Sequence, residues 1–74
     1  MAYRISAKTL VTIGKNIKRI RKQQDREQLE IATDAGIDVS YFARIERGMA
    51  NPTLEVLYAV VKALRVKSQE VLPF

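Results

Sequence analysis

The segment ATDAGIDVSYF at residues 32–42 constrains the fold of this chain most, because a glycine there separates two short helical patterns. Residues 27–35 carry their less polar side chains at helical spacing, and Gly36 ends that pattern. Glycine accepts the positive φ that a tight turn directly after a helix requires. Asp38 can then cap a helix at residues 39–47, since its carboxylate accepts from backbone N–H groups two or three residues on. The segment predicts two short helices joined by a tight turn.

Longer helical patterns lie on both sides of this pair. Ser6 can cap a first helix whose apolar side chains recur at steps of three and four residues. Thr53 can cap a fourth helix with the same spacing, and Pro52 disfavours helix at Asn51 before it. The inward stripes comprise Leu10, Ile13, Ile17 and Ile20 in the first helix and Leu54, Leu57, Val61 and Leu64 in the fourth.

A last short helix is expected from Ser68. No segment alternates apolar and polar side chains as a strand does, and no repeat or interdomain linker is visible. Gly14 lies inside the first helix at a cost of about 1 kcal/mol relative to alanine, which predicts a close packing contact there. The sequence therefore predicts an all-α fold, a compact five-helix domain that occupies residues 1–74 as a single unit.

The chain has 74 residues and contains neither cysteine nor histidine. This composition removes disulfides, zinc sites built from these residues, thiol nucleophiles and histidine general bases. No nucleophile–base pair, metal cluster or phosphate-binding loop is visible either. We therefore expect no enzyme activity, no metal, no cofactor and no small-molecule ligand. Because a chain this short often needs further stabilisation, association with a second copy is expected.

Charge is unevenly distributed along the chain. The formal net charge is +5, and all eight acids lie from Asp25 onward, so residues 1–24 are basic without any acid. A basic half-domain suggests a polyanionic partner, either nucleic acid or an anionic membrane surface, with a merely basic soluble protein as the alternative. No stretch approaches the length of a membrane span, and the apolar run near the N-terminus is too short for a signal peptide. We expect a soluble, cytoplasmic protein.

The third predicted helix has two different sides. With Asp38 as its cap, Phe42 and Ile45 face the body of the domain. The opposite side comprises Val39, Ser40, Ala43 and Arg44. A helix, a short turn at a glycine and a second helix form the signature of a helix-turn-helix, whose second helix enters the DNA major groove. The outward side is therefore a candidate DNA-binding face.

The stretch "IGKNIKRIRK", followed by "QLEIATDAGIDVSYFARIERGMANPTLEVLYAVVKALRV", resembles the Cro and phage-repressor class of helix-turn-helix proteins, often called XRE-like. The resemblance covers residues 13–72, and "AGIDVSYFARIERG" with "NPTLEVL" behind it is its most specific part. It implies a five-helix, lambda-repressor-like fold and a sequence-specific transcriptional regulator that binds double-stranded operator DNA as a two-fold dimer. The small size is similar to that of phage or plasmid repressors and restriction–modification controller proteins.

The sequence departs from the pattern of this family in four places. Arg26 and Glu27 stand where an apolar residue and a Ser or Thr usually open the second helix, and Arg65 stands where glycine is common after the fourth. Met49 and Ala50 occupy a loop in which some relatives place basic residues against phosphate. These departures leave the start of the second helix less sharply defined and predict weaker phosphate anchoring from the loop.

The resemblance assigns base contacts to positions that match Val39, Ser40, Ala43 and Arg44. Arg44 suits a bidentate contact with guanine O6 and N7, and a solvated or ion-paired arginine is the alternative. Ser40 can donate or accept a hydrogen bond, and the small apolar side chains of Val39 and Ala43 suit a thymine methyl group.

Candidate phosphate contacts are Gln28, Tyr41, Arg47 and Asn51. Gln28 matches the family's glutamine at the start of the second helix, where side chain and backbone N–H groups meet a phosphate. Each of the others also has a structural interpretation. The ring of Tyr41 can cover the edge of the core, Arg47 suits a helix C-terminus, and Asn51 suits a turn.

The resemblance further implies a structural ion pair between Arg21 and Glu46 that does not touch DNA. Val71, Leu72 and Phe74 are more apolar than an exposed tail should be, which predicts a homodimer joined through the last turn. A two-fold dimer would present two recognition helices about 34 Å apart, one DNA turn, on a near-palindromic site.

Two other functional classes stay open. The basic amphipathic first helix could lie on an anionic membrane surface, although the helical core needs the same apolar stripe. The helix-turn-helix could also dock a protein partner instead of DNA. Salt-dependent binding of duplex DNA would argue against that second alternative.

Overall fold

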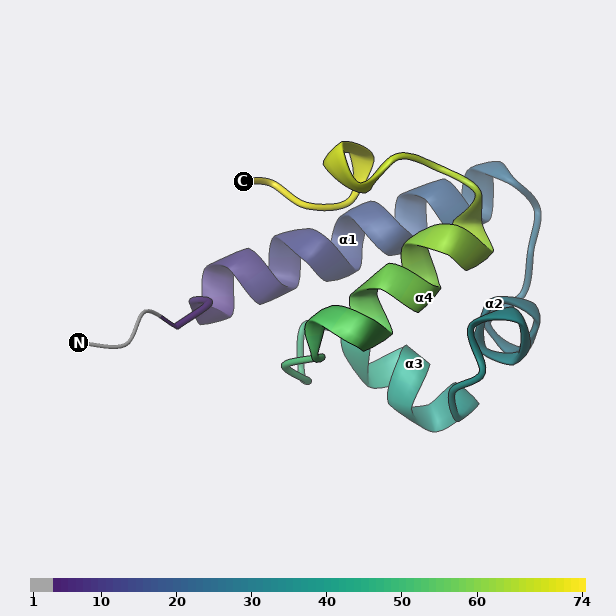
Figure 1. Ribbon diagram of the computed structural model, residues 1–74, viewed down its shortest axis with the longest axis horizontal. Helices are drawn as coiled ribbons and strands as arrows, with labels where there is room; N and C mark the ends of the chain where they lie inside the picture. Colours follow the sequence, from purple (N-terminus) through teal and green to yellow (C-terminus); the bar gives the residue numbers. More distant parts are fainter. Residues whose placement is uncertain (1–3) are drawn as a thin grey trace.

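The computed structural model describes residues 4–74, which form four α-helices, one turn of 3-10 helix and no strand (Figure 1). The elements are α1 (Ala7–Gln23), α2 (Gln28–Ala35), α3 (Val39–Glu46), α4 (Leu54–Leu64) and the 3-10 helix η1 (Ser68–Glu70). The long α1 extends along one side of the molecule, and the segment after α4 returns beside it (Figure 1). Within residues 4–74, no helix combines the length and hydropathy that crossing a bilayer requires.

The prediction of a fifth α-helix is wrong. The 3-10 helix η1 spans three residues, and the N–H of Val71 donates to the carbonyl of Ser68 at 3.0 Å in the tighter 3-10 pattern. Pro73 explains why no α-helix develops, because it has no N–H to donate and disfavours the α conformation at Leu72. The described part of the chain is all-helical with four α-helices.

Three helices begin at the side-chain caps that the sequence predicted. The side-chain oxygens of Ser6, Asp38 and Thr53 accept hydrogen bonds from backbone N–H groups two or three residues on, at 3.1, 3.1 and 3.2 Å. The second helix begins differently, with the carboxylate of Glu30 accepting from the N–H of Glu27 at 3.2 Å. The start of α2 is therefore defined despite the unusual residues there.

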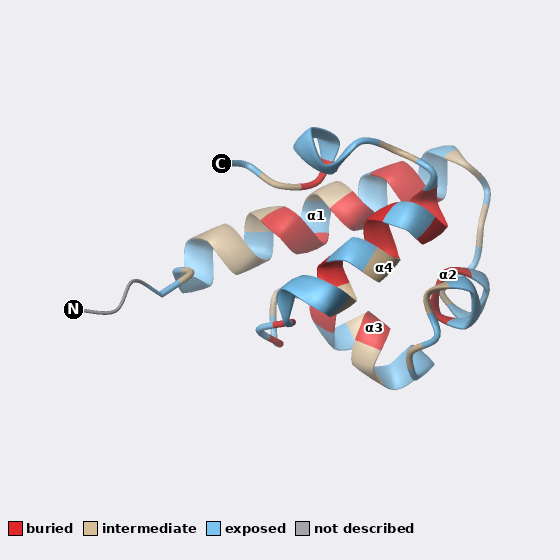
Figure 2. Ribbon diagram, viewed as in Figure 1, coloured by how far each residue is buried: buried red, intermediate tan, exposed pale blue. Residues whose placement is uncertain are grey.

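The apolar stripes of the helices meet in one core, and Figure 2 shows buried positions recurring along α1 and α4. Both predicted stripes extend past the core at their first residue, since Leu10 is half-buried and Leu54 is 79% exposed. The buried apolar side chains of the four helices are Ile13, Ile17, Ile20, Ile31, Ala32, Phe42, Ile45, Leu57, Val60, Val61, Ala63 and Leu64. Leu54 therefore belongs to the surface, where its apolar side chain is unexplained by the fold of one chain.

Gly14 brings α1 against the end of α3. A Cβ atom at this position would lie 2.4 Å from the carbonyl oxygen of Glu46 and 2.5 Å from that of Ile45. Both neighbours are backbone atoms, so neither can move aside as a flexible side chain would. The close contact predicted at Gly14 is confirmed, and it fixes the distance between α1 and α3.

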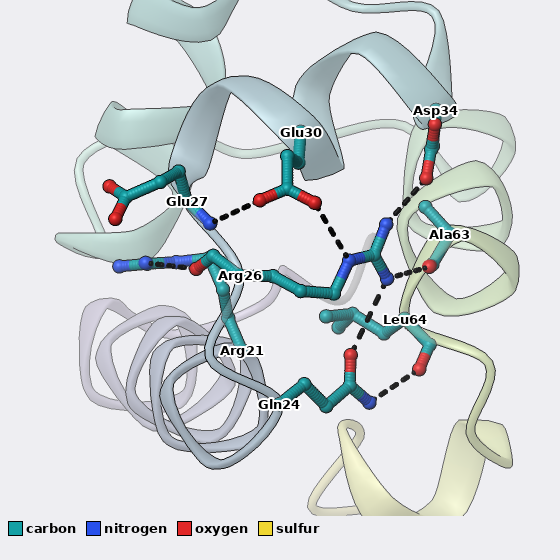
Figure 3. A network of polar contacts seen from close by, with 8 residues as sticks. All are labelled: Arg21, Gln24, Arg26, Glu27, Glu30, Asp34, Ala63 and Leu64. Carbon is teal, nitrogen blue, oxygen red and sulfur yellow. Dashed lines mark hydrogen bonds and ion pairs between the residues drawn. The ribbon is translucent and has the colours of Figure 1, made fainter.

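Arg26 ties α2 to the C-terminal end of α4 (Figure 3). Its guanidinium donates to Asp34 Oδ2 at 2.5 Å and to the carbonyl of Ala63 at 2.8 Å. Gln24 Nε2 donates to the neighbouring carbonyl of Leu64 at 2.7 Å. The last carbonyls of a helix have no partner within it, so these two side chains satisfy groups that α4 cannot satisfy itself. The arginine that replaces an apolar residue here has a structural role.

Arg65 ends α4 in a left-handed conformation, with φ +61° and ψ +38°. Only glycine adopts this conformation without steric cost, whereas a residue with a Cβ atom loses about 1–2 kcal/mol. Glycine is the usual residue after this helix in the family that the sequence resembles, so Arg65 carries a backbone strain that a relative with glycine avoids.

We predict that Arg65→Gly raises the free energy of unfolding by up to about 1 kcal/mol, because relief of the left-handed strain exceeds the added freedom of glycine in the unfolded chain. Urea denaturation followed by circular dichroism measures the change. Arg65→Ala is the matched control, since it removes the same side chain but keeps the Cβ atom. Equal stabilisation by both variants would show that charge, and not backbone conformation, is responsible.

Candidate nucleic-acid interface

The turn between α2 and α3 depends on Gly36. Its φ of +71° and ψ of +29° are left-handed, and no atom lies within 4 Å of where its Cβ would be. Backbone conformation, and not space, therefore requires glycine here. The N–H of Gly36 donates to the carbonyl of Thr33 at 3.1 Å, and that of Ile37 donates to Ala32 at 2.9 Å. These bonds end α2 and set the direction in which the chain continues into α3.

Helix α3 has a buried side and an exposed side. Phe42 and Ile45 are 0% and 2% exposed and belong to the core. The outer face, by which we mean Val39, Ser40, Ala43 and Arg44, contains three exposed residues and the half-buried Ala43. The buried pair anchors the helix to the body of the molecule, so the outer face is presented to solvent on a rigid support.

Arg44 is held over the neighbouring aromatic ring. Its Cζ atom lies 5.7 Å from the centroid of the Tyr41 ring, and Tyr41 itself is half-buried against the core. A guanidinium over a ring face gains about 0.5–1 kcal/mol at an exposed site. This attraction restricts the conformations of Arg44 before any ligand binds.

Asp38 engages the second residue of α3 twice. Its Oδ2 atom accepts hydrogen bonds from the hydroxyl and from the backbone N–H of Ser40. These bonds lower the pKa of Asp38 below its ordinary value. Because the folded pKa is the lower one, the carboxylate stabilises the fold above its unfolded pKa, and this contribution disappears as pH falls through the folded pKa. Asp38 is therefore ionised at neutral pH.

A buried ion pair connects α1 with the end of α3. Arg21 Nε donates to Glu46 Oε2 at 2.7 Å and Arg21 Nη2 donates to Glu46 Oε1 at 3.1 Å. Both residues are buried, at 7% and 6% exposure, and hydrogen bonding to Glu46 raises the pKa of Arg21. Gln28 Nε2 donates to Glu46 Oε1 at 2.8 Å. The structure thus brings Arg21 and Glu46 together, and the carboxylate joins α1, α2 and α3.

The four candidate phosphate contacts come from different elements. Gln28 begins α2, Tyr41 lies in α3, Arg47 follows α3, and Asn51 lies in the loop before α4. Gln28 and Tyr41 are half-buried, whereas Arg47 and Asn51 are exposed. A side-chain amide has two N–H groups, so the bond from Gln28 to Glu46 leaves one for another partner.

The assignment of Val71 to a dimer interface needs correction. Val71 is 0% exposed and lies in the core of its own chain, and Asn16 Nδ2 donates to its carbonyl at 2.9 Å. It therefore has no side-chain surface to offer a second copy. Leu72 is half-buried, and Phe74 is 77% exposed.

An exposed apolar groove on α4 was missed by the sequence interpretation. The side chains of Leu54 and Tyr58 are 79% and 64% exposed, and they line a groove of about 200 Å³ together with Leu72. Tyr58 lies four residues after Leu54, so both occupy one side of the helix. Tyr58 is a large aromatic residue that the predicted inward stripe of the fourth helix did not include, and this was the sequence signal that could have identified the groove.

Comparisons with known proteins give one consistent result. A helix-turn-helix family profile matches residues 17–71. The immunity repressor protein of Bacillus phage phi105 is 42% identical over 57 residues, which are 77% of this chain but only 40% of that repressor, so this chain spans less than half of its length. The restriction-modification controller protein C.AhdI from Aeromonas hydrophila has a TM-score of 0.81 at 29% identity, covering 84% of this chain and 94% of that one. The controller protein C.Esp1396I, solved as a tetramer in complex with its natural 35 base-pair operator, has a TM-score of 0.76 at 30% identity, covering 80% and 78%.

We predict that Arg21→Met and Glu46→Leu each lower the free energy of unfolding by about 3 kcal/mol or more, because each leaves a buried charge without its partner. The double variant should lose clearly less than the sum of the two, since it leaves neither charge behind. Chemical denaturation of the four proteins measures this coupling. Two mild and additive losses would show that the pair contributes nothing beyond its separate side chains.

Proposed function

Because the chain belongs to the helix-turn-helix family, we propose that it is a sequence-specific double-stranded DNA-binding protein that regulates transcription from an operator. The observation that carries the proposal is the two-sided α3, anchored by Phe42 and Ile45 and exposing a face with Ser40 and Arg44. The basic N-terminal part of the chain favours a polyanionic partner. Such a protein would act in the cytoplasm.

The outer face of α3 enters the major groove in this proposal. Arg44 donates two parallel hydrogen bonds to guanine O6 and N7, a geometry that its planar guanidinium suits and that the ring of Tyr41 supports. Val39 and Ala43 contact base edges or a thymine methyl, because they present apolar atoms and nothing that repels a methyl group. Ser40 contacts a base through its hydroxyl.

Phosphate contacts hold α3 in register along the groove. Gln28 uses the N–H that Glu46 does not occupy, and its orientation is set by that bond. Tyr41 offers its hydroxyl, and Arg47 and Asn51 extend from the end of α3 and the following loop. These contacts supply affinity for any duplex and no base preference of their own.

We further propose that two copies associate through the groove on α4. Leu54 and Tyr58 are more exposed than apolar side chains of their size usually are, and Leu72 from the C-terminal segment continues the same surface. A second copy would cover this surface by two-fold symmetry and bring two α3 helices to half-sites about 34 Å apart. The phage relative is an immunity repressor, and repression is the mode of regulation that we propose here.

Arg44→Ala should weaken binding to the preferred duplex by about 1–3 kcal/mol and relax the preference at one base pair, because the lost contact carries sequence information. Lys18→Ala and Arg19→Ala are the matched controls, since both positions are exposed on α1 and not on α3. They should weaken preferred and scrambled duplexes alike and flatten the salt dependence. Binding is measured on both duplexes at two salt concentrations. Equal losses on both duplexes with Arg44→Ala would contradict base contact.

Tyr58→Asp should shift the chain toward monomer, because an ionised carboxylate would be buried in an apolar contact. Sedimentation equilibrium of the free protein measures the change. Leu29→Asp is the control, since it places the same charge on an apolar side chain of α2 that is 63% exposed outside the groove. A wild-type chain that remains monomeric, or a dimer that tolerates Tyr58→Asp, would rule out association through this groove.

A further inference from the structure

The hydroxyl of Ser40 has only one proton, and the fold already uses it. Its Oγ atom is hydrogen-bonded to Asp38 Oδ2, which also accepts from the backbone N–H of Ser40 at 3.1 Å. An ionised carboxylate carries no proton, so in this pair the hydroxyl must be the donor. The lone pairs of Ser40 Oγ remain free, and Ser40 is exposed on the outer face of α3.

We propose that Ser40 is a specificity-determining residue that accepts a hydrogen bond from the exocyclic amino group of cytosine or adenine, and that Asp38 is the positioning residue that prevents it from donating. This inference rests on the proposed DNA-binding function. A free serine hydroxyl does not discriminate in this way, because it can donate or accept. The discrimination arises from its bond with Asp38.

The edges of the bases in the major groove explain the consequence. Guanine presents only acceptors there, and thymine presents an acceptor and a methyl group. Cytosine and adenine each present an amino donor. An oxygen that can only accept is repelled by the first two edges and attracted by the last two. The carboxylate of Asp38, which is exposed next to Ser40, adds negative charge and strengthens the same preference.

The positions of Ser40 and Arg44 along α3 give this preference a place in the operator. They are four residues apart, a rise of about 6 Å along a helix. Successive bases on one strand are separated by about 3.4 Å along the DNA axis, so in a complex whose recognition helix lies along the groove the two side chains meet bases about two steps apart. Arg44 offers only donors and selects guanine, whereas Ser40 offers only an acceptor and selects an amino group. The half-site should therefore contain a guanine and, about two steps away, a contacted cytosine or adenine.

Selection of bound duplexes from a random pool, with the wild-type chain and Ser40→Ala, identifies the base pair whose preference Ser40 determines. Every base pair contains one amino group in the major groove, so base analogues are needed to identify the contacted atom. At that pair, one duplex lacks the amino group, with purine in place of adenine or 2-pyrimidinone in place of cytosine. A second duplex carries a 7-deaza purine, which lacks the N7 acceptor.

For the wild-type chain, deletion of the amino group should weaken binding about three- to tenfold more than it does for Ser40→Ala, the range expected for one hydrogen bond. The 7-deaza purine should affect both proteins equally. Glycine is a tolerated helix cap, so Asp38→Gly removes the carboxylate and frees the hydroxyl proton of Ser40. This variant should bind duplexes with a wider range of base pairs at the position that Ser40 contacts.

The outcomes separate this inference from the function on which it rests. A wild-type chain that enriches no sequence overturns both. Sequence-specific binding in which Ser40→Ala relaxes no position, or in which only the 7-deaza purine distinguishes wild type from Ser40→Ala, leaves the function standing and overturns the inference. The comparison of wild type with Ser40→Ala decides it even where Asp38→Gly fails to fold.

Discussion

The presentation of α3 depends on one steric constraint, the absence of a side chain at Gly14. The backbone of α1 touches the carbonyls of Ile45 and Glu46 there, and a Cβ atom would overlap with them. Gly48 adds a second contact, since a Cβ atom on it would lie 2.8 Å from the Cα of Val11, about one turn earlier in α1. With two backbone contacts on one side of α1, the end of α3 has a fixed distance and direction. The other contacts of the fold stabilise α3 in the orientation relative to α1 that these two glycines permit.

The buried ion pair serves this orientation more than it serves net stability. Glu46 touches Gly14 through its backbone, and its carboxylate reaches Arg21, which lies two turns further along the same side of α1. Removing two charges from water offsets much of their attraction, so such a pair contributes little compared with well-packed apolar side chains. Its hydrogen bonds are directional, however, and the carboxylate of Glu46 also accepts a hydrogen bond from Gln28. A change in the angle between α1, α2 and α3 would break bonds that no other group can replace.

Local features of this molecule were predictable from residue types and spacing, whereas contacts between distant segments were predictable only where the family resemblance implied one, as for Arg21 and Glu46. The caps at Ser6, Asp38 and Thr53 follow from residue type and helical spacing, which act over one turn. A glycine inside a helix likewise predicted a close contact at Gly14, but not that the contact is with α3. The partner of Arg26 could not be inferred, because the carbonyl of Ala63 lies 37 residues away. Val71 illustrates the same limit. An apolar residue near a chain end suits either a partner's surface or its own core, and only the return of the chain beside α1 decides between them.

The candidate site follows the same division. Which residues of α3 face outward was predictable, because Asp38 fixes the start of the helix and the helical period then determines the direction of each side chain. The hydrogen-bonding capacity that each outward residue has left for a ligand was not predictable, because it depends on the bonds that the residue already makes within the protein. The sequence left Ser40 free to donate or accept, and the bond with Asp38 removes one choice. Arg44 likewise rests on Tyr41 before it meets a ligand. The specificity of such a face therefore depends on the partners that its side chains have within the protein. These partners limit which hydrogen bonds each side chain can still make, and they reduce the conformational entropy that the side chain loses when it binds.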